Sequence, residues 1–196
     1  MKLENTKRIV IKIGSAILFD PTSGSLNKDW LNSLAEDVKF LKEREKEVII
    51  VSSGAIAMGA KDLNLDMKNM KLDMNQAVSS VGHILLMSSF KNAFEQNEIK
   101  ISQILHTLDD TEQRRRSINA RRTIDTLLKL GIVPVVNEND TIATTEIRYG
   151  DNDRLASRVA QISSSDCLIL LSNINGLYSA DPTNGEDIKL IPTVNE

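Results

Sequence analysis

The sequence is poor in cysteine and in aromatic residues. It has a single cysteine, Cys167, among 196 residues, so a disulfide framework within the chain is excluded. Cys167 lies in an apolar run, which predicts a buried, unreactive thiol in a reducing compartment. Aromatic residues make up only 4% of the chain, so leucine, isoleucine, valine and methionine must fill the core.

Long apolar segments and a strong net charge are also absent. No apolar run approaches the length that spans a membrane, and no apolar segment follows MKLENTKR as it would in a signal peptide. We therefore expect a cytoplasmic protein with no membrane partner. The net charge of -3 argues against a general nucleic-acid binder. Five arginines within 114–122 are a local exception, and they predict a solvated helix face, with an anion site as the alternative.

Five short runs rich in isoleucine, valine and leucine alternate with helical patterns. Each run ends in small or polar residues and is typical of a buried parallel strand. The runs are 8–14, 47–54, 100–107, 131–139 and 166–173. This alternation predicts a single α/β domain with an open, mainly parallel sheet whose two faces are covered by helices.

Hydrophobic periodicity places helices between these runs. We expect one helix to begin at an Asn27 N-cap, others to cover 74–96 and 111–130, and another to follow Asp153. Residues 141–150 instead have strand-like composition and predict a hairpin or a lid.

Small and polar residues follow the strands, at the edge where open α/β sheets bind ligands. They let backbone N–H groups approach an anion, and two such turns would suit a phosphorylated ligand. Tight strand–helix turns are the alternative explanation. The positions are Gly14-Ser15, Ser52-Ser53-Gly54, the segment 137–153 and Ser172-Asn173.

Lys12 is the sharpest anomaly, because it interrupts the apolar run 8–14. An unpaired ammonium group in an apolar interior is costly, so Lys12 must reach solvent, pair with a carboxylate or face an anionic ligand. Its place two residues before Gly14 favours the ligand.

The segment 137–153 gathers carboxylates and amides, among them Asp140, Asn152 and Asp153. A solvated acidic loop is one interpretation. The run Asp151-Asn152-Asp153 could also cap the next helix, but one cap does not need three such residues. The cluster could therefore hold an ammonium group, a metal–phosphate or Lys12.

Several motifs are incomplete. GAIAMGAK (54–61) resembles a P-loop but lacks the Lys-Ser/Thr pair, and it predicts a helix instead. There is no Gly-x-Gly-x-x-Gly sequence and no pattern of a nucleophile–base triad. His83 and His106 lack ligand spacing, so we predict no metal site built from protein side chains.

Four motifs in order carry a family resemblance. They are VIKIGSAIL, VIIVSSGAIAMGA, VPVVNENDTIATTEIRYGDNDRLAS and LILLSNINGLYSADP. Together they resemble the glutamate 5-kinases (γ-glutamyl kinases) of the amino acid kinase family, from about residue 8 onward. The resemblance implies a three-layer α/β/α sandwich similar to that of acetylglutamate kinase. It implies transfer of the γ-phosphoryl group of ATP to the γ-carboxylate of L-glutamate, the first step of proline biosynthesis.

The resemblance also implies ligands and partners. ATP would bring Mg²⁺ on its phosphates, proline would be a feedback inhibitor, and the protein would form a homo-oligomer, either a dimer or a tetramer. In the substrate half, Ser53, Asp140 and Asn152 match glutamate-binding positions. Asp153 matches an aspartate that organises the catalytic lysines.

The nucleotide half is implied by fewer residues. Lys12 matches the phosphate-contacting lysine, and Gly14 and Ser15 form the turn beside it. Ser172 and Asn173 match a nucleotide-contacting pair that is usually Thr-Asp, so Asn173 replaces an acidic residue. We expect 1–196 to be an amino acid kinase domain that stops before the family's Gly-x-Gly-Gly-Met-x-Thr-Lys loop and lacks the C-terminal RNA-binding-type domain of some members.

Three alternatives stay open. The chain could be another member of the family with a different carboxylate or phosphate acceptor. It could be a non-catalytic sensor of glutamate or proline. It could also be a structural subunit that uses 74–96 or 111–130 as an interface helix.

Overall fold

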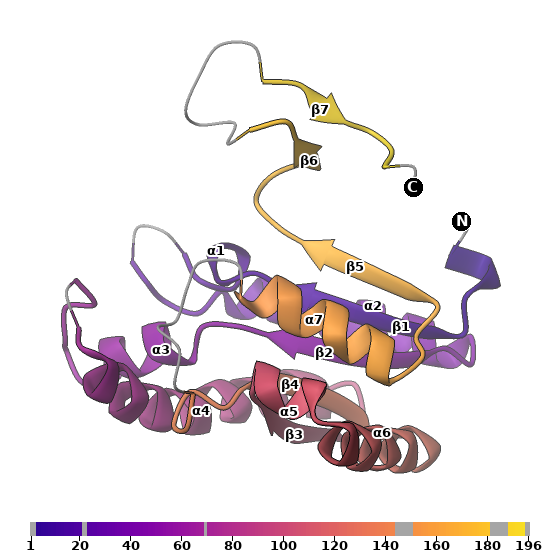
Figure 1. Cartoon of the computed structure of the whole chain (residues 1–196), viewed down its shortest axis with the longest axis horizontal. Helices are drawn as coiled ribbons and strands as arrows, with labels where there is room; N and C mark the ends of the chain where they lie inside the picture. The colour runs from indigo at the N-terminus through magenta and orange to yellow at the C-terminus, as the bar shows by residue number, and fades with distance from the viewer. Residues whose placement is uncertain (1–2, 21–22, 69, 144–150, 181–187, 195–196) are drawn as a thin grey trace.

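A five-stranded parallel sheet forms the centre of the protein (Figure 1). The computed structural model describes residues 3–20, 23–68, 70–143, 151–180 and 188–194. The strand order is β3-β4-β2-β1-β5. The strands are β1 (Arg8–Ile13), β2 (Glu47–Ser52), β3 (Ile101–His106), β4 (Val133–Glu138) and β5 (Cys167–Leu171). Each strand lies within one of the five apolar runs, so the predicted parallel sheet is confirmed.

Helices cover both faces of this sheet, which confirms the α/β/α sandwich. Along β1, Ile9, Ile11 and Ile13 point to one face and Val10 to the other, because side chains alternate along a strand. The first face is covered by α2 (Lys28–Glu43) and α4 (Leu72–Glu95). The second is covered by α6 (Arg114–Lys129) and α7 (Asp151–Ile162).

Smaller elements complete the chain. They are a 3-10 helix (Leu3–Asn5), α1 (Ser15–Leu18), α3 (Ala55–Asp62), α5 (Leu108–Glu112), β6 (Leu177–Tyr178) and β7 (Leu190–Ile191). In Figure 1 the antiparallel β6–β7 pair lies beyond the β5 edge of the sheet. None of the described helices is long and apolar enough to cross a membrane.

Burial separates the central strands from the edge strands. Residues of β1, β2 and β4 are almost all buried, but β3 and β5 are largely half-buried, and Leu170 is 51% exposed. The prediction of five fully buried strands is therefore wrong for the two edges, which have a neighbouring strand on one side only. Cys167 is accordingly half-buried, where we expected a buried thiol.

Helix boundaries agree with the sequence in part. The Asn27 side chain accepts a hydrogen bond from the Trp30 backbone N–H at 3.2 Å, which confirms the N-cap. The stretch 111–130 is not one helix, because a Thr107/Asp110 capping box begins α5 and the chain extends at Gln113 before α6. The last helix begins at Asp151 rather than after Asp153.

Two further predictions concern the sequence motifs. GAIAMGAK supplies the helix α3, as expected. All five arginines of 114–122 are exposed on α6, which confirms a solvated helix face. The proposed hairpin or lid at 141–150 falls mostly on 144–150, outside the described residues.

Helices α3 and α4 cross with their backbones in contact at two glycines. A Cβ atom added to Gly82 would collide with the carbonyl oxygen of Ala55, and one added to Gly59 would collide with that of Val78. Backbone atoms cannot move aside as a flexible side chain can. The crossing therefore requires glycine at both positions.

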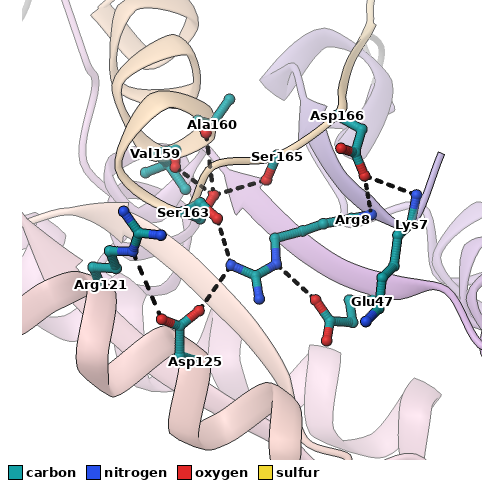
Figure 2. Close-up of polar contacts among 10 residues, drawn as sticks. All are labelled: Lys7, Arg8, Glu47, Arg121, Asp125, Val159, Ala160, Ser163, Ser165 and Asp166. Atoms are coloured by element: carbon teal, nitrogen blue, oxygen red, sulfur yellow. Dashed lines mark hydrogen bonds and ion pairs between the residues drawn. The ribbon is translucent and has the colours of Figure 1, made fainter.

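The end of the sheet opposite the strand C-termini is tied together by Arg8 (Figure 2). Its guanidinium contacts Glu47 of β2 at 2.7 Å and Asp125 of α6 at 2.8 Å, and it donates to the Ser163 carbonyl beyond α7. Burial alone would lower the pKa of Arg8, but the two carboxylates outweigh it and raise that pKa. Arg8 therefore stays charged and joins β1 to β2, to α6 and to the residue that follows α7.

Asp166 holds the backbone at the same end of the sheet (Figure 2). Its carboxylate accepts hydrogen bonds from the backbone N–H groups of Lys7 and Arg8, each at 2.8 Å. These bonds favour the charged carboxylate and lower the pKa of Asp166.

We predict that Gly82→Ala destabilises the protein by about 1–3 kcal/mol, because the added methyl group overpacks the helix crossing. The sign of this change in the free energy of unfolding is informative, because Gly→Ala in an unconstrained helix is stabilising. Urea unfolding monitored by circular dichroism measures the effect. Ser88→Ala, at an exposed position of α4, is the control and should change stability little. An unchanged or raised midpoint for Gly82→Ala would show that the crossing is looser than described.

We predict that Asp166→Asn reduces the acid sensitivity of folding. A carboxyl group whose folded pKa is lowered stabilises the fold above its unfolded pKa, about 3.9, and loses this contribution as the pH falls through the folded value. The melting temperature of the wild type should therefore fall more steeply below about pH 4 than that of the variant. Asp62→Asn, at the exposed end of α3, is the control. Parallel curves for the wild type and Asp166→Asn would contradict the assignment.

Candidate active site

The candidate residues from the sequence lie at one edge of the sheet, where the parallel strands end. Gly14 follows β1, Ser53 follows β2, and Ser172 follows β5. Asp140 follows β4, the strand beside β2. Asn152 and Asp153 reach this edge from the first turn of α7. The fold therefore gathers residues that are up to 160 positions apart in the chain (Ser172 minus Lys12).

Lys12 forms an ion pair with Asp153. The Nζ atom of Lys12 lies 2.6 Å from Oδ1 of Asp153, and the two side chains are 12% and 50% exposed. Lys12 sits on β1 between β2 and β5, so its backbone is enclosed on both sides. Of the three ways to accommodate this lysine, the structure shows the carboxylate partner. Oδ1 of Asp153, the oxygen in this pair, is itself buried, so the exposure of Asp153 comes from the rest of its side chain.

Gly14 lies next to this ion pair. A Cβ atom added to Gly14 would lie 3.6 Å from Nζ of Lys12, an ordinary contact distance. The Gly14 N–H donates to the carbonyl of Leu171 at 3.2 Å, and Ser15 begins the short helix α1. The first N–H of this turn is therefore occupied by β5, so an anion there would use later groups.

Ser53 and Asn152 contact each other directly. The Asn152 amide donates to Oγ of Ser53 at 2.6 Å, and that hydroxyl donates to the Ile13 carbonyl at 3.3 Å. The other amide atom of Asn152, Oδ1, is buried and has no hydrogen bond to any described residue. A buried acceptor without a donor is costly, and a ligand N–H group would satisfy it.

Asp140 is buried, at 6% exposure, and its described contacts are with α4. Ser79 donates a hydrogen bond from Oγ to Oδ2 of Asp140, and Nε2 of His83 lies 3.4 Å from the same oxygen. Sequence reasoning did not find Ser79 and considered His83 only as a zinc ligand. The available signal was two polar residues four positions apart on the helix face that also carries Leu86 and Phe90.

An open cleft of about 660 Å³ adjoins the ion pair. Lys12, Asp153 and Ser172 line one part of it, and Trp30 and Asp37 of α2 line another. The Ser172 hydroxyl donates to Oδ1 of Asn173 at 3.4 Å. This places Lys12, Asp153 and Ser172 around one space, whereas Ser53 and Asn152 form a separate contact and Asp140 is held by α4.

A second, smaller hollow of about 130 Å³ lies at the ends of β3 and β4. Arg116 and Glu138 line it. Burial would raise the pKa of Asp110 beside it, but hydrogen bonds from Thr107 and the Arg116 charge outweigh burial and lower that pKa. Burial lowers the pKa of His106, against the opposing charge of Asp110. The α5 capping aspartate is therefore charged and the neighbouring imidazole neutral near pH 7.

The amino acid kinase family model matches residues 7–196. The chain belongs to the amino acid kinase family. Solved structures of this fold agree with the architecture. The isopentenyl phosphate kinase of T. acidophilum has a TM-score of 0.62 at 16% identity, covering 93% of this chain and 77% of its own. The UMP kinase of Bacillus anthracis has a TM-score of 0.61 at 17% identity, covering 94% and 72%.

Two curated relatives in the amino acid kinase family are much more similar in sequence. The glutamate 5-kinase of Pelagibacter ubique is 58% identical over 194 residues, and that of Paramagnetospirillum magneticum is 51% identical over 194 residues. Each alignment covers 99% of this chain and 52% of the relative. The chain thus spans about half the length of these relatives.

We predict that Ser53 and Asn152 stabilise the fold cooperatively. In a double-mutant cycle, Ser53→Ala and Asn152→Ala together should cost less than the sum of the single changes, by about 1 kcal/mol. The physical reason is that either single change already breaks the 2.6 Å hydrogen bond. Urea unfolding of the four proteins measures this coupling. Additive losses would mean that the two side chains do not interact in solution.

Proposed function

We propose that the chain provides the catalytic site of an ATP-dependent glutamate 5-kinase. The reaction would transfer the γ-phosphoryl group of ATP to the γ-carboxylate of L-glutamate, in the first step of proline biosynthesis. The observation that carries this proposal is the Lys12–Asp153 ion pair, whose two residues line the cleft at the sheet edge, with Ser53 in contact with Asn152, the residue next to Asp153. Glutamate is proposed as the phosphoryl acceptor because the relatives that are 58% and 51% identical are glutamate 5-kinases.

The chemistry needs charge stabilisation rather than a base. A glutamate carboxylate has a pKa of about 4.3, so it is already ionised at neutral pH. The barrier comes from bringing this anion against a phosphoryl group, and positive charge that is held in place lowers it. Lys12 would contact the transferred phosphoryl group. Asp153 would hold the Lys12 ammonium in position and would take no proton.

Glutamate would bind through Ser53, Asp140 and Asn152. The free acceptor Oδ1 of Asn152 suits the N–H groups of an amino acid, and the buried carboxylate of Asp140 suits its α-ammonium group. Ser53 would contact the substrate through its hydroxyl. Together, these three polar groups, which follow β2 and β4 and lie in the first turn of α7, would select an amino acid over an acceptor without an amino group.

ATP would occupy the cleft beside Lys12, with Gly14, Ser15, Ser172 and Asn173 as its contacts. Mg²⁺ would arrive on the nucleotide phosphates and offset their charge. Among the described residues, no three His, Cys, Asp or Glu side chains are grouped to hold a metal ion. We also propose a homo-oligomer and inhibition by proline, as the family resemblance implies, and a cytoplasmic location, as the sequence pattern predicts.

We predict that Lys12→Met lowers turnover about 100-fold or more, because a positioned cation near the transferred group is removed. The measurement is ADP release with L-glutamate and Mg-ATP in a coupled assay. Lys91→Met is the matched control, since Lys91 is an exposed α4 residue paired only with Glu95 at 3.1 Å among the described side chains. Equal turnover of Lys12→Met and the wild type would reject the phosphate role. ADP release that does not depend on glutamate would reject the acceptor.

A further inference from the structure

One face of α4 changes from apolar to polar along its length. Leu86, Phe90 and Phe94 are fully buried in the core. The same face continues toward the helix N-terminus through Gln76, Ser79 and His83, which are three and four positions apart. We call these three residues the α4 polar stripe. It lies where α4 meets the segment 140–143.

All three stripe residues contact that segment. The Gln76 side-chain amide donates to the carbonyl of Ala143 at 3.0 Å. Ser79 donates to Oδ2 of Asp140, and Nε2 of His83 lies 3.4 Å from this same Oδ2. The other carboxylate oxygen of Asp140, Oδ1, takes part in neither contact. One oxygen of this buried carboxylate thus accepts a hydrogen bond from Ser79 and contacts His83, while neither residue contacts the second oxygen.

His83 is unusual in its own right. Its side chain is only 7% exposed, yet neither ring nitrogen has a well-aligned hydrogen bond within the described structure. Buried polar groups are normally satisfied, and exceptions occur where another role maintains them. Nε2 nevertheless lies close to Oδ2 of Asp140, at 3.4 Å, so the ring packs against this carboxylate oxygen.

We propose that Ser79 and His83 are positioning residues that aim Asp140 at the α-ammonium group of the amino acid substrate. This inference rests on the proposed function, in which Asp140 binds that ammonium group. Held at Oδ2 from α4, the carboxylate presents Oδ1 in one orientation. Ser79 and His83 would therefore determine selectivity for amino acids without touching the substrate.

A merely structural role predicts a different result. If the contacts only tethered α4 to the segment 140–143, their loss would lower stability and weaken every ligand of the site equally. A positioning role concerns only ligands that have an ammonium group. Glutarate has both carboxylates of glutamate and no ammonium group, so it separates the two roles.

The experiment is calorimetric titration of the chain with L-glutamate and, separately, with glutarate. Ser79→Ala and His83→Leu should each weaken glutamate binding about 10-fold, since each removes a polar contact that holds Oδ2 of Asp140 in place. Glutarate binding should stay within about 2-fold. His83→Gln keeps an N–H donor at this position and should restore glutamate binding to within about 3-fold of the wild type. Thermal melts confirm that each variant is folded.

Two further variants test whether Ser79 acts through Asp140. They are Asp140→Asn and the double variant Ser79→Ala/Asp140→Asn. If Ser79 acts through Asp140, the double variant binds glutamate no more weakly than Asp140→Asn alone. If Asp140→Asn weakens glutamate binding but Ser79→Ala and His83→Leu do not, the positioning role is overturned and the proposed function stays intact. The positioning role would also be overturned if Ser79→Ala and His83→Leu weakened glutarate binding as much as glutamate binding. A wild-type chain that binds no glutamate would reject the proposed function together with this inference.

Discussion

Two cationic side chains on strand β1 attach helix α7 to the sheet. Lys12, near the end of β1, pairs with Asp153 in the first turn of α7, and Arg8, at the start of β1, donates to the Ser163 carbonyl just beyond the last turn of α7. The helix is thus attached to the strand at both ends. A cation near the C-terminal end of a helix is also favoured by its dipole. Because α7 carries Asn152 and Asp153, this attachment places both at the edge where the strands end.

The fold could be predicted from the sequence because strand and helix periodicities alternate clearly. Apolar runs that end in small residues predicted all five strands of the parallel sheet, and Asn27 predicted the start of a helix. The order of the strands in the sheet depends on tertiary packing, which local pattern does not carry. The half-buried edges β3 and β5, and with them the exposure of Cys167, therefore could not be foreseen. The break at Gln113 was hidden because Thr107 and Asp110 cap a helix inside a continuous polar stretch.

The candidate site could be predicted only where its residues follow strands directly. Lys12 was identifiable as a charge in an apolar run, and its partner Asp153 lay in a distinctive motif. Ser79 and His83 could not be identified this way, because they reach Asp140 from a helix that is 61 and 57 positions earlier in the chain. Polar residues on a helix that also carries many other polar side chains have several explanations until the neighbouring segment is known. Sequence pattern thus identifies groups that touch ligands more readily than groups that orient them.

The glycine crossing of α3 and α4 links two parts of the site that share no direct contact. Helix α3 starts at Ala55, immediately after Ser53 and Gly54, and α4 carries the polar stripe beneath Asp140. With backbone against backbone at Gly59 and Gly82, the separation of these helices is set by atoms that cannot adjust. The distance between the Ser53 turn and the Asp140 carboxylate is therefore constrained by the packing of these two helices. A larger residue at Gly59 or Gly82 would push the two helices apart, and the displacement would reach both the Ser53 turn and the residues that contact Asp140.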